Sequence, residues 1–247
     1  MSKNKIVATI EARMTSSRLP GKVLLPAAGK PMLWHLFHRL KQVPSLNEIV
    51  LATTINHDDD VLIDFAEENQ LVYYRGSEND VMQRVIDAAS SVNADIVVEI
   101  TGDCPIIDSG IVEQCIRMFL HNNCDYVSNA HIRSYPDGMD VQVFSLAALK
   151  KSANMTNDPL EREHVTLHIR RHPEFFKHIH LIAPKELYWP ELGLTLDEQK
   201  DYDLLCKIIE YFADKNIFFT CFDIINYLKN NPEFIKINTD VQRKGDT

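Results

Sequence analysis

The first half of the chain alternates between two hydrophobic patterns. Short apolar runs rich in Val and Ile, typical of buried strands, are separated by amphipathic segments with helical spacing. The predicted strands cover residues 5–12, 48–54, 71–76, 94–101 and 124–129, and the predicted helices cover 32–43, 57–70, 80–92 and 109–122. Strands that alternate with helices in this way indicate an α/β fold, with a mostly parallel sheet flanked by helices.

The second half follows a different pattern. Alternating apolar and polar positions predict exposed or antiparallel strands, and longer periods predict further helices. The strands are expected at 138–145, 176–183 and 192–196, the helices at 159–172, 197–216 and 223–234, and an irregular tail at 240–247. Because no repeat, low-complexity segment or linker divides the chain, we expect a single domain over residues 1–247.

Composition and charge narrow the class of protein. The chain is 45% hydrophobic and 25% charged, which is ordinary for a globular enzyme, and its net charge of -9 argues against nucleic-acid or membrane-surface binding. Charged residues interrupt the first apolar run too early for a signal peptide, and no apolar run has the length of a membrane span. Five cysteines without a C-x-x-C pair suit reduced thiols. We therefore expect a cytoplasmic protein.

One loop departs from this acidic character. No acid lies between Glu11 and Glu48, a window that contains Arg13, Arg18, Lys22, Lys30, Arg39 and Lys41. The loop directly after the first strand also offers hydroxyls and a glycine, a combination that binds polyphosphate at the carboxyl end of a strand. It lacks the spacing G-x-x-x-x-G-K-S/T and has no G-x-G. Its composition alone fits a phosphate site and a solvated surface loop equally well.

Two carboxylates follow predicted strands. Asp103, in "ITGDCPIID", is a candidate Mg²⁺ ligand or a turn residue, and Asp108 competes for the cap of the next helix. Asp197, in "LTLDEQKDYDLL", is either a second metal ligand or the cap of the long helix. The residues alone leave both alternatives open.

Histidines and a turn mark the second half. His164, His168 and His172 recur every four positions, so one helix face would carry all three. No H-E-x-x-H is present, and a zinc site is disfavoured; we expect His164 to point inward and the other two to lie on the surface. Asp137 and Gly138 predict a turn, after which Asp140 and Gln142 share a strand face.

Taken together, these segments resemble the CMP-sugar-acid synthetases, the cytidylyltransferases for Kdo and acylneuraminate. The signature "ARMTSSRLPGKVLLPAAGKPML" carries this resemblance. The segments "RGSENDVMQR", "ITGDCPIID", "YPDGMDVQVFS", "EREHVTLHIRRHPE" and "LTLDEQKDYDLL" are closer to the SpsF-type branch, named for spore-coat polysaccharide biosynthesis. The likeness extends over essentially the whole chain.

The resemblance implies a GT-A/Rossmann-like nucleotidyltransferase domain that transfers CMP from CTP to an anionic sugar-type acceptor. Residues up to about 130 would form the nucleotide-binding half, about 131–220 the acceptor or lid part, and about 221–247 a C-terminal helix and tail. The nucleotide residues would be Ala12, Arg13, Ser17, Arg18, Lys22, Arg75, Ser77, Asp80 and Thr101. The catalytic residues would be Arg13, Arg18, Lys22 and Asp103, with Mg²⁺ on Asp103 and Asp197. The acceptor residues would be Asp137, Asp140, Gln142, Arg162 and His164.

Three further points qualify this hypothesis. Thr101 stands where the Kdo enzymes tend to have glutamine. This difference leaves open both the contacts to the base and the identity of the acceptor. Alternative functions are a glycosyltransferase that uses a nucleotide sugar, and a non-catalytic scaffold with the same fold. Relatives are often dimers, and the alternating strand at 138–145 is a candidate pairing edge for a homodimer.

Overall fold

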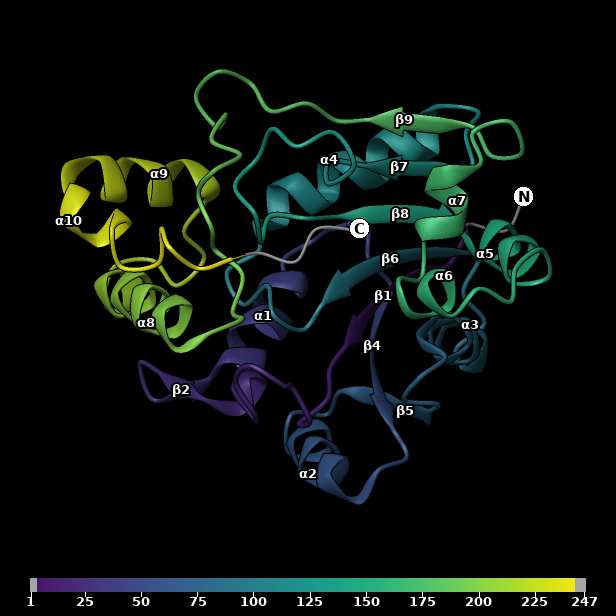
Figure 1. The fold of residues 1–247 in the computed structure, drawn as a ribbon, viewed down its shortest axis with the longest axis horizontal. Helices are drawn as coiled ribbons and strands as arrows, with labels where there is room; N and C mark the ends of the chain where they lie inside the picture. Colours follow the sequence, from purple (N-terminus) through teal and green to yellow (C-terminus); the bar gives the residue numbers. More distant parts are fainter. Residues whose placement is uncertain (1–3, 243–247) are drawn as a thin grey trace.

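A seven-stranded sheet forms the centre of the computed structural model, which describes residues 4–242 (Figure 1). Its strand order is β5-β4-β1-β6-β8-β7-β9. The strands are β1 (Ile6–Glu11), β4 (Glu48–Thr54), β5 (Val72–Gly76), β6 (Ile96–Thr101), β7 (Tyr126–Ser128), β8 (Gln142–Ser145) and β9 (His178–His180). Neighbouring strands run parallel except at β8, which is antiparallel to both β6 and β7. The predicted α/β fold with a mostly parallel sheet is confirmed.

Helices cover both faces of this sheet. They are α1 (Met32–Leu40), α2 (Asp60–Glu68), α3 (Val81–Ser91), α4 (Ser109–His121), α5 (Leu146–Ala153), α6 (Pro159–Glu163), α7 (Leu167–Arg171), α8 (Gln199–Ala213), α9 (Cys221–Asn230) and α10 (Pro232–Ile235). Two short 3₁₀ helices, η1 (Lys22–Leu24) and η2 (His57–Asp59), and a small hairpin of β2 (Pro26–Ala27) and β3 (Lys30–Pro31) complete the described elements. No helix among residues 4–242 has the length and apolarity to cross a membrane.

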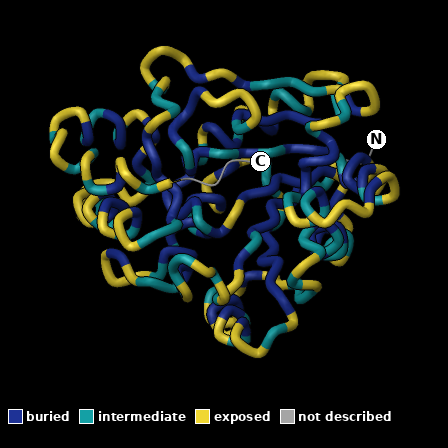
Figure 2. Tube along the Cα trace, viewed as in Figure 1, coloured by how far each residue is buried: buried dark blue, intermediate teal, exposed yellow. Residues whose placement is uncertain are grey.

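Alternate residues of the strands supply two hydrophobic cores. Ile10 and Val98 face the core that holds α1, α2, α4, α8 and α9. Val7 and Val97 face the other core, which holds α3, α5 and α7. Because β1 is covered on both faces, its sequence is almost continuously apolar, and the strands form the buried centre in Figure 2. The sheet is thus covered on both faces, and the loops at the carboxyl ends of its parallel strands are the place where ligands bind in such folds.

Three predictions about secondary structure are wrong. Residues 159–172 form two short helices instead of one, with a break at His164. Residues 192–196 form no strand and make only an isolated bridge between Asp137 and Gly193. The candidate dimer edge at 138–145 is internal, because β8 pairs with β6 on one side and β7 on the other. Of the predicted tail, residues 243–247 lie outside the described part of the chain, while Asp240 forms an ion pair with Lys200.

Candidate active site

The site begins where β1 and β6 end side by side. The backbone N–H of Gly102 donates to the carbonyl oxygen of Glu11 at 2.9 Å. A Cβ at position 102 would lie 2.8 Å from that same oxygen, closer than real Cβ atoms approach backbone, and 3.0 Å from the Cβ of Ala12, which is also a tight contact. Glycine is therefore required for the two strand ends to meet. The meeting places the acid-free loop next to Asp103.

Backbone contacts fold this loop back on itself. The carboxylate of the buried Asp59 accepts a hydrogen bond from the backbone N–H of Met14 at 2.6 Å. The N–H of Gly21 donates to the carbonyl of Met14 at 2.9 Å, and Gly21 adopts the left-handed conformation with φ of 70°. Glycine takes this conformation at little cost. The turn starts η1 and directs Lys22 into the interior instead of toward solvent.

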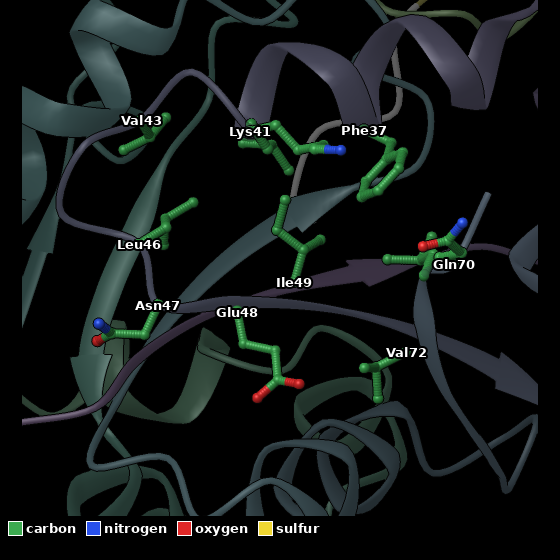
Figure 3. A pocket seen from close by; sticks show the side chains of 11 residues that line it. Phe37, Lys41, Val43, Leu46, Asn47, Glu48, Ile49, Gln70 and Val72 are labelled. Carbon is green, nitrogen blue, oxygen red and sulfur yellow. The ribbon is translucent and has the colours of Figure 1, made fainter.

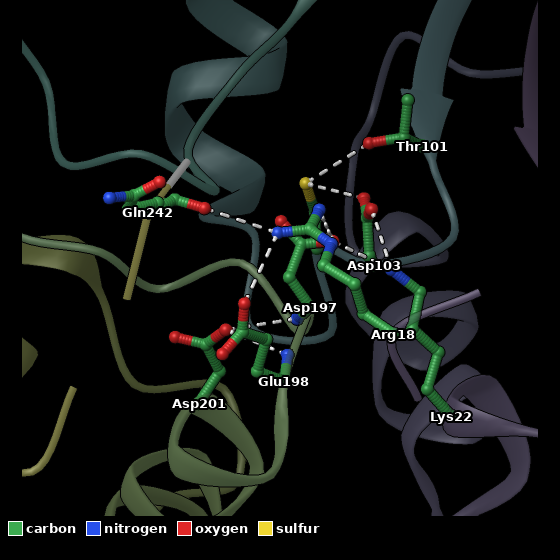
Figure 4. A network of polar contacts seen from close by, with 9 residues as sticks. Arg18, Lys22, Thr101, Asp103, Asp197, Glu198, Asp201 and Gln242 are labelled. Carbon is green, nitrogen blue, oxygen red and sulfur yellow. Dashed lines mark hydrogen bonds and ion pairs between the residues drawn. The ribbon is translucent and has the colours of Figure 1, made fainter. Parts of the chain in front are cut away.

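Cations of the loop meet carboxylates at the centre of the site (Figure 4). The ammonium nitrogen of Lys22 lies 3.1 Å from Asp103 Oδ2 and 3.0 Å from Asp197 Oδ1. Arg18 Nη2 lies 2.9 Å from that same Asp197 oxygen. Burial alone would lower the pKa of Lys22, but the two carboxylates outweigh it and raise the pKa. Burial likewise opposes ionisation of Asp103, but Lys22 and the Thr101 hydroxyl lower its pKa.

The structure resolves which acids cap helices. Glu198 caps α8 in a capping box with Asp201, so Asp197 is left facing the site. Asp108 caps α4 by accepting from the backbone N–H of Gly110 at 2.7 Å. Neither Asp103 nor Asp197 is therefore needed at a helix start. Both carboxylates are placed where a ligand can use them.

Two cavities open on either side of these carboxylates. The larger has a volume of about 660 Å³ and lies over the acid-free loop, with Ala12, Arg13 and Ser17 in its wall. The smaller has a volume of about 490 Å³ and extends over β8. Five residues line both cavities: Arg18, Thr101, Asp103, His164 and Asp197. The cation and carboxylate cluster thus stands at the junction of two spaces.

The smaller cavity is strongly polar. Asp137, Asp140, Gln142 and His164 line it, and these are four of the five residues expected on the acceptor side. Gln142 is held in place because its amide donates to Glu99 at 2.8 Å and accepts from Tyr126 at 2.5 Å. Burial and, second, the nearby Asp137 raise the pKa of Asp140 to about 7. The wall therefore offers fixed hydrogen-bonding groups to a polyhydroxylated ligand.

Four residues that were expected at the site line neither cavity. The structure places Arg75 against Asp60, at 2.7 Å, and against the backbone carbonyls of Thr54 and Asn56, each at 2.8 Å. Ser77 is exposed and accepts from a backbone N–H within its own turn.

The remaining two are paired with each other. Asp80 was expected beside the nucleotide and Arg162 on the acceptor side, but they form an ion pair that joins α3 to α6. Asp80 also caps α3. Their placement favours roles in holding the walls of the site together.

Some residues that the structure places here were not among the predicted site residues. Glu78 fixes the loop by accepting from Arg13 at 2.9 Å and from Thr15 at 3.0 Å. Arg84 lies in the wall of the larger cavity beside Glu11, whose pKa is raised well above its ordinary value by burial and then by Glu99. The sequence signal for Arg84 is its position on the apolar face of the predicted helix 80–92, where a charged residue is unusual.

The three histidines do not share a helix face. His164 ends α6 and lines both cavities, as its predicted inward position requires. His168 is buried and bonded to Glu161 at 2.8 Å, so its predicted surface position is wrong. Ligand atoms of Glu161, His168 and His172 lie within 4.8 Å of one another, but the Arg171 guanidinium also lies 3.3 Å from Glu161. That cation competes with a metal for the carboxylate.

A third cavity, of about 320 Å³, lies away from this site (Figure 3). Apolar side chains of α1 and of the starts of β4 and β5 line it, including Phe37, Ile49 and Val72. Since it lies at the amino ends of the strands, it is remote from the cluster at the carboxyl edge. It has one acid, Glu48, and one cation, Lys41, in its wall.

Comparisons with known proteins point to one family. The sequence model of a family described as cytidylyltransferase matches residues 7–235. A solved cytidylyltransferase from Leptospira borgpetersenii is 35% identical, with a TM-score of 0.89 over 98% of this chain and 100% of that one. The spore coat polysaccharide biosynthesis protein SpsF of Bacillus subtilis is 30% identical over 93% of this chain and 96% of its own. A 3-deoxy-manno-octulosonate cytidylyltransferase of Trichlorobacter lovleyi is 33% identical over 48% of this chain and 46% of its own.

Proposed function

Because the chain belongs to the cytidylyltransferase family, we propose that it transfers CMP from CTP to an anionic sugar-type acceptor and releases pyrophosphate. The observation that carries this proposal is the junction of the two cavities. Arg18, Lys22 and the two carboxylates stand between a space over the cationic loop and a polar space over β8. A transferase that joins two substrates needs one space for each and its charged groups between them.

The triphosphate of CTP would lie in the larger cavity. Arg13, Ser17, Arg18 and Lys22 line this space, and their cationic and hydroxyl groups suit phosphate oxygens. Negative charge grows on the departing pyrophosphate as the bond to the α-phosphorus breaks. Cations fixed in place before reaction stabilise that charge at little reorganisation cost, typically about 10²–10³ in rate for each contact.

The carboxylates fit a hard divalent cation. Oxygens of Asp103 and Asp197 already converge on one positive charge, the Lys22 ammonium, at 3.1 and 3.0 Å. Carboxylate oxygens are also the ligands that Mg²⁺ prefers. These two residues would hold Mg²⁺, which supplies neutralisation of the phosphate charge and orientation of the attacking oxygen.

The acceptor would enter the smaller cavity. Gln142, Asp137 and Asp140 offer hydrogen bonds to hydroxyl groups, and Arg133 provides a cation for an anionic group. A hydroxyl oxygen presented from this side would meet the α-phosphorus at the junction, with the leaving pyrophosphate on the opposite, loop side. In-line phosphoryl transfer requires attack and departure from such opposite sides. We propose surface polysaccharide assembly as the pathway, following the name of the SpsF relative. The homodimer and the cytoplasmic location are kept as predictions from the sequence.

The glycosyltransferase alternative is less well supported. That class usually places two acids around the metal in a D-x-D pair, whereas the residues two positions before and after Asp103 are Thr101 and Pro105. Burial and the charge of Asp103 raise the pKa of Cys104 well above its ordinary value, so the thiol stays protonated and is a poor ligand for Mg²⁺. Asp59, the middle acid of a nearby acidic run, is buried and serves to hold the loop.

An acceptor screen tests the proposal. The purified protein is mixed with CTP, Mg²⁺ and each of Kdo, a nonulosonic acid and neutral sugars, and pyrophosphate release is followed. We expect release with CTP and at least one sugar acid, and none with CTP alone. Release of a nucleoside diphosphate from a nucleotide sugar would support the glycosyltransferase instead. Absence of any thermal shift with CTP and the other nucleoside triphosphates would support a non-catalytic scaffold.

A further inference from the structure

The groups assigned to two different ligands are bound to each other in this structure. Lys22 and Arg18, proposed to bind phosphate, both contact Asp197 Oδ1, at 3.0 and 2.9 Å. Lys22 also contacts Asp103 Oδ2 at 3.1 Å. The carboxylates proposed for the metal and the cations proposed for the nucleotide therefore neutralise one another (Figure 4).

This cluster is largely shielded from water. The side chain of Lys22 is only 11% exposed, that of Asp197 is 16% exposed, and that of Asp103 is 26% exposed. Solvent can therefore replace little of an ion pair that is broken here, and an uncompensated charge would be unfavourable. A divalent cation that arrived alone would have to displace the Lys22 ammonium from the two carboxylates that neutralise it. A phosphate that arrived alone would draw Lys22 and Arg18 away from two carboxylates.

The backbone limits how the cluster can relax. The N–H of Leu196 donates to the carbonyl of Asp103 at 2.8 Å, which ties the two carboxylate-bearing segments together. Lys22 follows the fixed turn at Gly21. The side chains of Lys22 and Arg18 are thus the parts that can change partners, since both are long and flexible.

We propose that Lys22 and Arg18 couple divalent-cation binding to triphosphate binding, by exchanging the carboxylates of Asp103 and Asp197 for phosphate oxygens as the cation takes their place. The inference rests on the proposed function for the identity of the two ligands. The divalent cation neutralises the carboxylates that Lys22 and Arg18 leave, and the phosphate oxygens neutralise Lys22 and Arg18. Each ligand therefore raises the affinity for the other, and by linkage the two effects are equal. When pyrophosphate leaves, the same exchange in reverse releases the cation with it.

Binding measurements without CTP or acceptor test this coupling. The first uses Mn²⁺ alone as the probe, titrated into wild type, Lys22→Met and Lys22→Ala, with Lys30→Met as the matched control because Lys30 lies on β3 outside both cavities. Removal of the competing ammonium should tighten Mn²⁺ binding about tenfold, within the usual range of coupling between sites. The control should match wild type. A lysine that only binds phosphate would leave the Mn²⁺ affinity unchanged.

The second measurement is the reciprocal one. Inorganic pyrophosphate is titrated into wild type and Asp197→Asn in the presence of EDTA, and the variant should bind about tenfold more tightly because Arg18 and Lys22 are freed. Both expected results are gains in affinity, which a misfolded variant cannot produce. Circular dichroism shows which of the two Lys22 variants is folded, and that variant is used for the comparison. An unchanged affinity in either measurement overturns the proposal. Gains in both, without pyrophosphate release in the acceptor screen, would uphold the coupling and reject the proposed reaction.

Discussion

The carbonyl oxygen of Asp103 accepts a hydrogen bond from the backbone N–H of Leu196, with 2.8 Å between oxygen and nitrogen. This bond joins the end of β6 to the segment that precedes α8. Near this bond, the carboxylates of Asp103 and Asp197 lie 3.1 and 3.0 Å from the Lys22 ammonium. The position of each carboxylate is thus fixed by main chain, and a side-chain substitution at either one should change the chemistry more than the fold.

Asp103→Asn tests that separation. We expect turnover with CTP and Mg²⁺ to fall by at least about 10²-fold, because one of the two anionic ligands is lost at the junction of the cavities. The melting temperature should stay close to that of wild type, since Lys22 keeps its contact with Asp197. Pyrophosphate release and thermal unfolding measure the two quantities. Near-normal turnover would exclude Asp103 as a metal ligand.

Asp108→Ala should have the opposite effect. The Asp108 carboxylate accepts from the backbone N–H groups of Gly110 and Cys221, each at 2.7 Å, and so holds the starts of α4 and α9 together. Its loss should lower the free energy of unfolding by about 1–3 kcal/mol. The KM for CTP should not change, because Asp108 lines neither cavity. Denaturant unfolding and steady-state kinetics give both values; a raised KM with normal stability would contradict the assignment.

The pair of Asp80 and Arg162 should act in stability and not in acceptor binding. Arg162 Nε lies 2.9 Å from Asp80 Oδ1, and a second guanidinium nitrogen lies 2.5 Å from Oδ2. We expect a coupling of about 1 kcal/mol in the free energy of unfolding between Asp80→Asn and Arg162→Met, reduced by partial exposure. Asparagine preserves the cap of α3. Additive effects on stability, together with a selective rise in the KM for the acceptor in Arg162→Met, would restore the acceptor role.

Asp140 should make stability depend on pH. Its pKa is raised to about 7 in the folded protein from an ordinary 3.8, so the folded state keeps a proton that the unfolded state has lost. The contribution of this group to the free energy of unfolding therefore falls as pH rises from about 4 to about 7, by at most about 1.4 kcal/mol per pH unit. Above about pH 7 it no longer changes with pH. Asp140→Asn cannot titrate, so its melting temperature relative to wild type should rise across that window. A constant difference would mean that Asp140 ionises normally.

Much of the fold could be predicted because the strands are buried on both faces. The run of apolar residues in β1 is typical of a strand buried on both faces, and the amphipathic segment that forms α3 is typical of a helix that covers such a sheet. The loop from Glu11 to Lys22 was also visible, since charge bias is a property of the sequence itself. The contact between this loop and Asp197 depends on tertiary structure. Only the family resemblance predicted that the two belong to one site.

Other features arise only from contacts between distant segments. Residues 159–172 have helical spacing, yet the helix breaks at His164, after which the hydroxyl of Thr166 bonds to Gln142 on β8. Likewise, nothing local shows that Asp80 reaches across to Arg162. At His164 tertiary contacts outweigh the local preference for one continuous helix. The ion pair depends on how α3 and α6 pack, which the sequence pattern does not show.

The place of β8 in the sheet has a consequence for how the protein is made. This strand is synthesised after β7 but lies between β7 and β6, so β7 has no partner on its inner side until the later strand arrives. Asp197 comes later still. A nascent chain that has formed β1, β4, β5 and β6 already displays the cationic loop but lacks the opposing carboxylate. The two carboxylates can therefore meet at Lys22 only after most of the chain has been made.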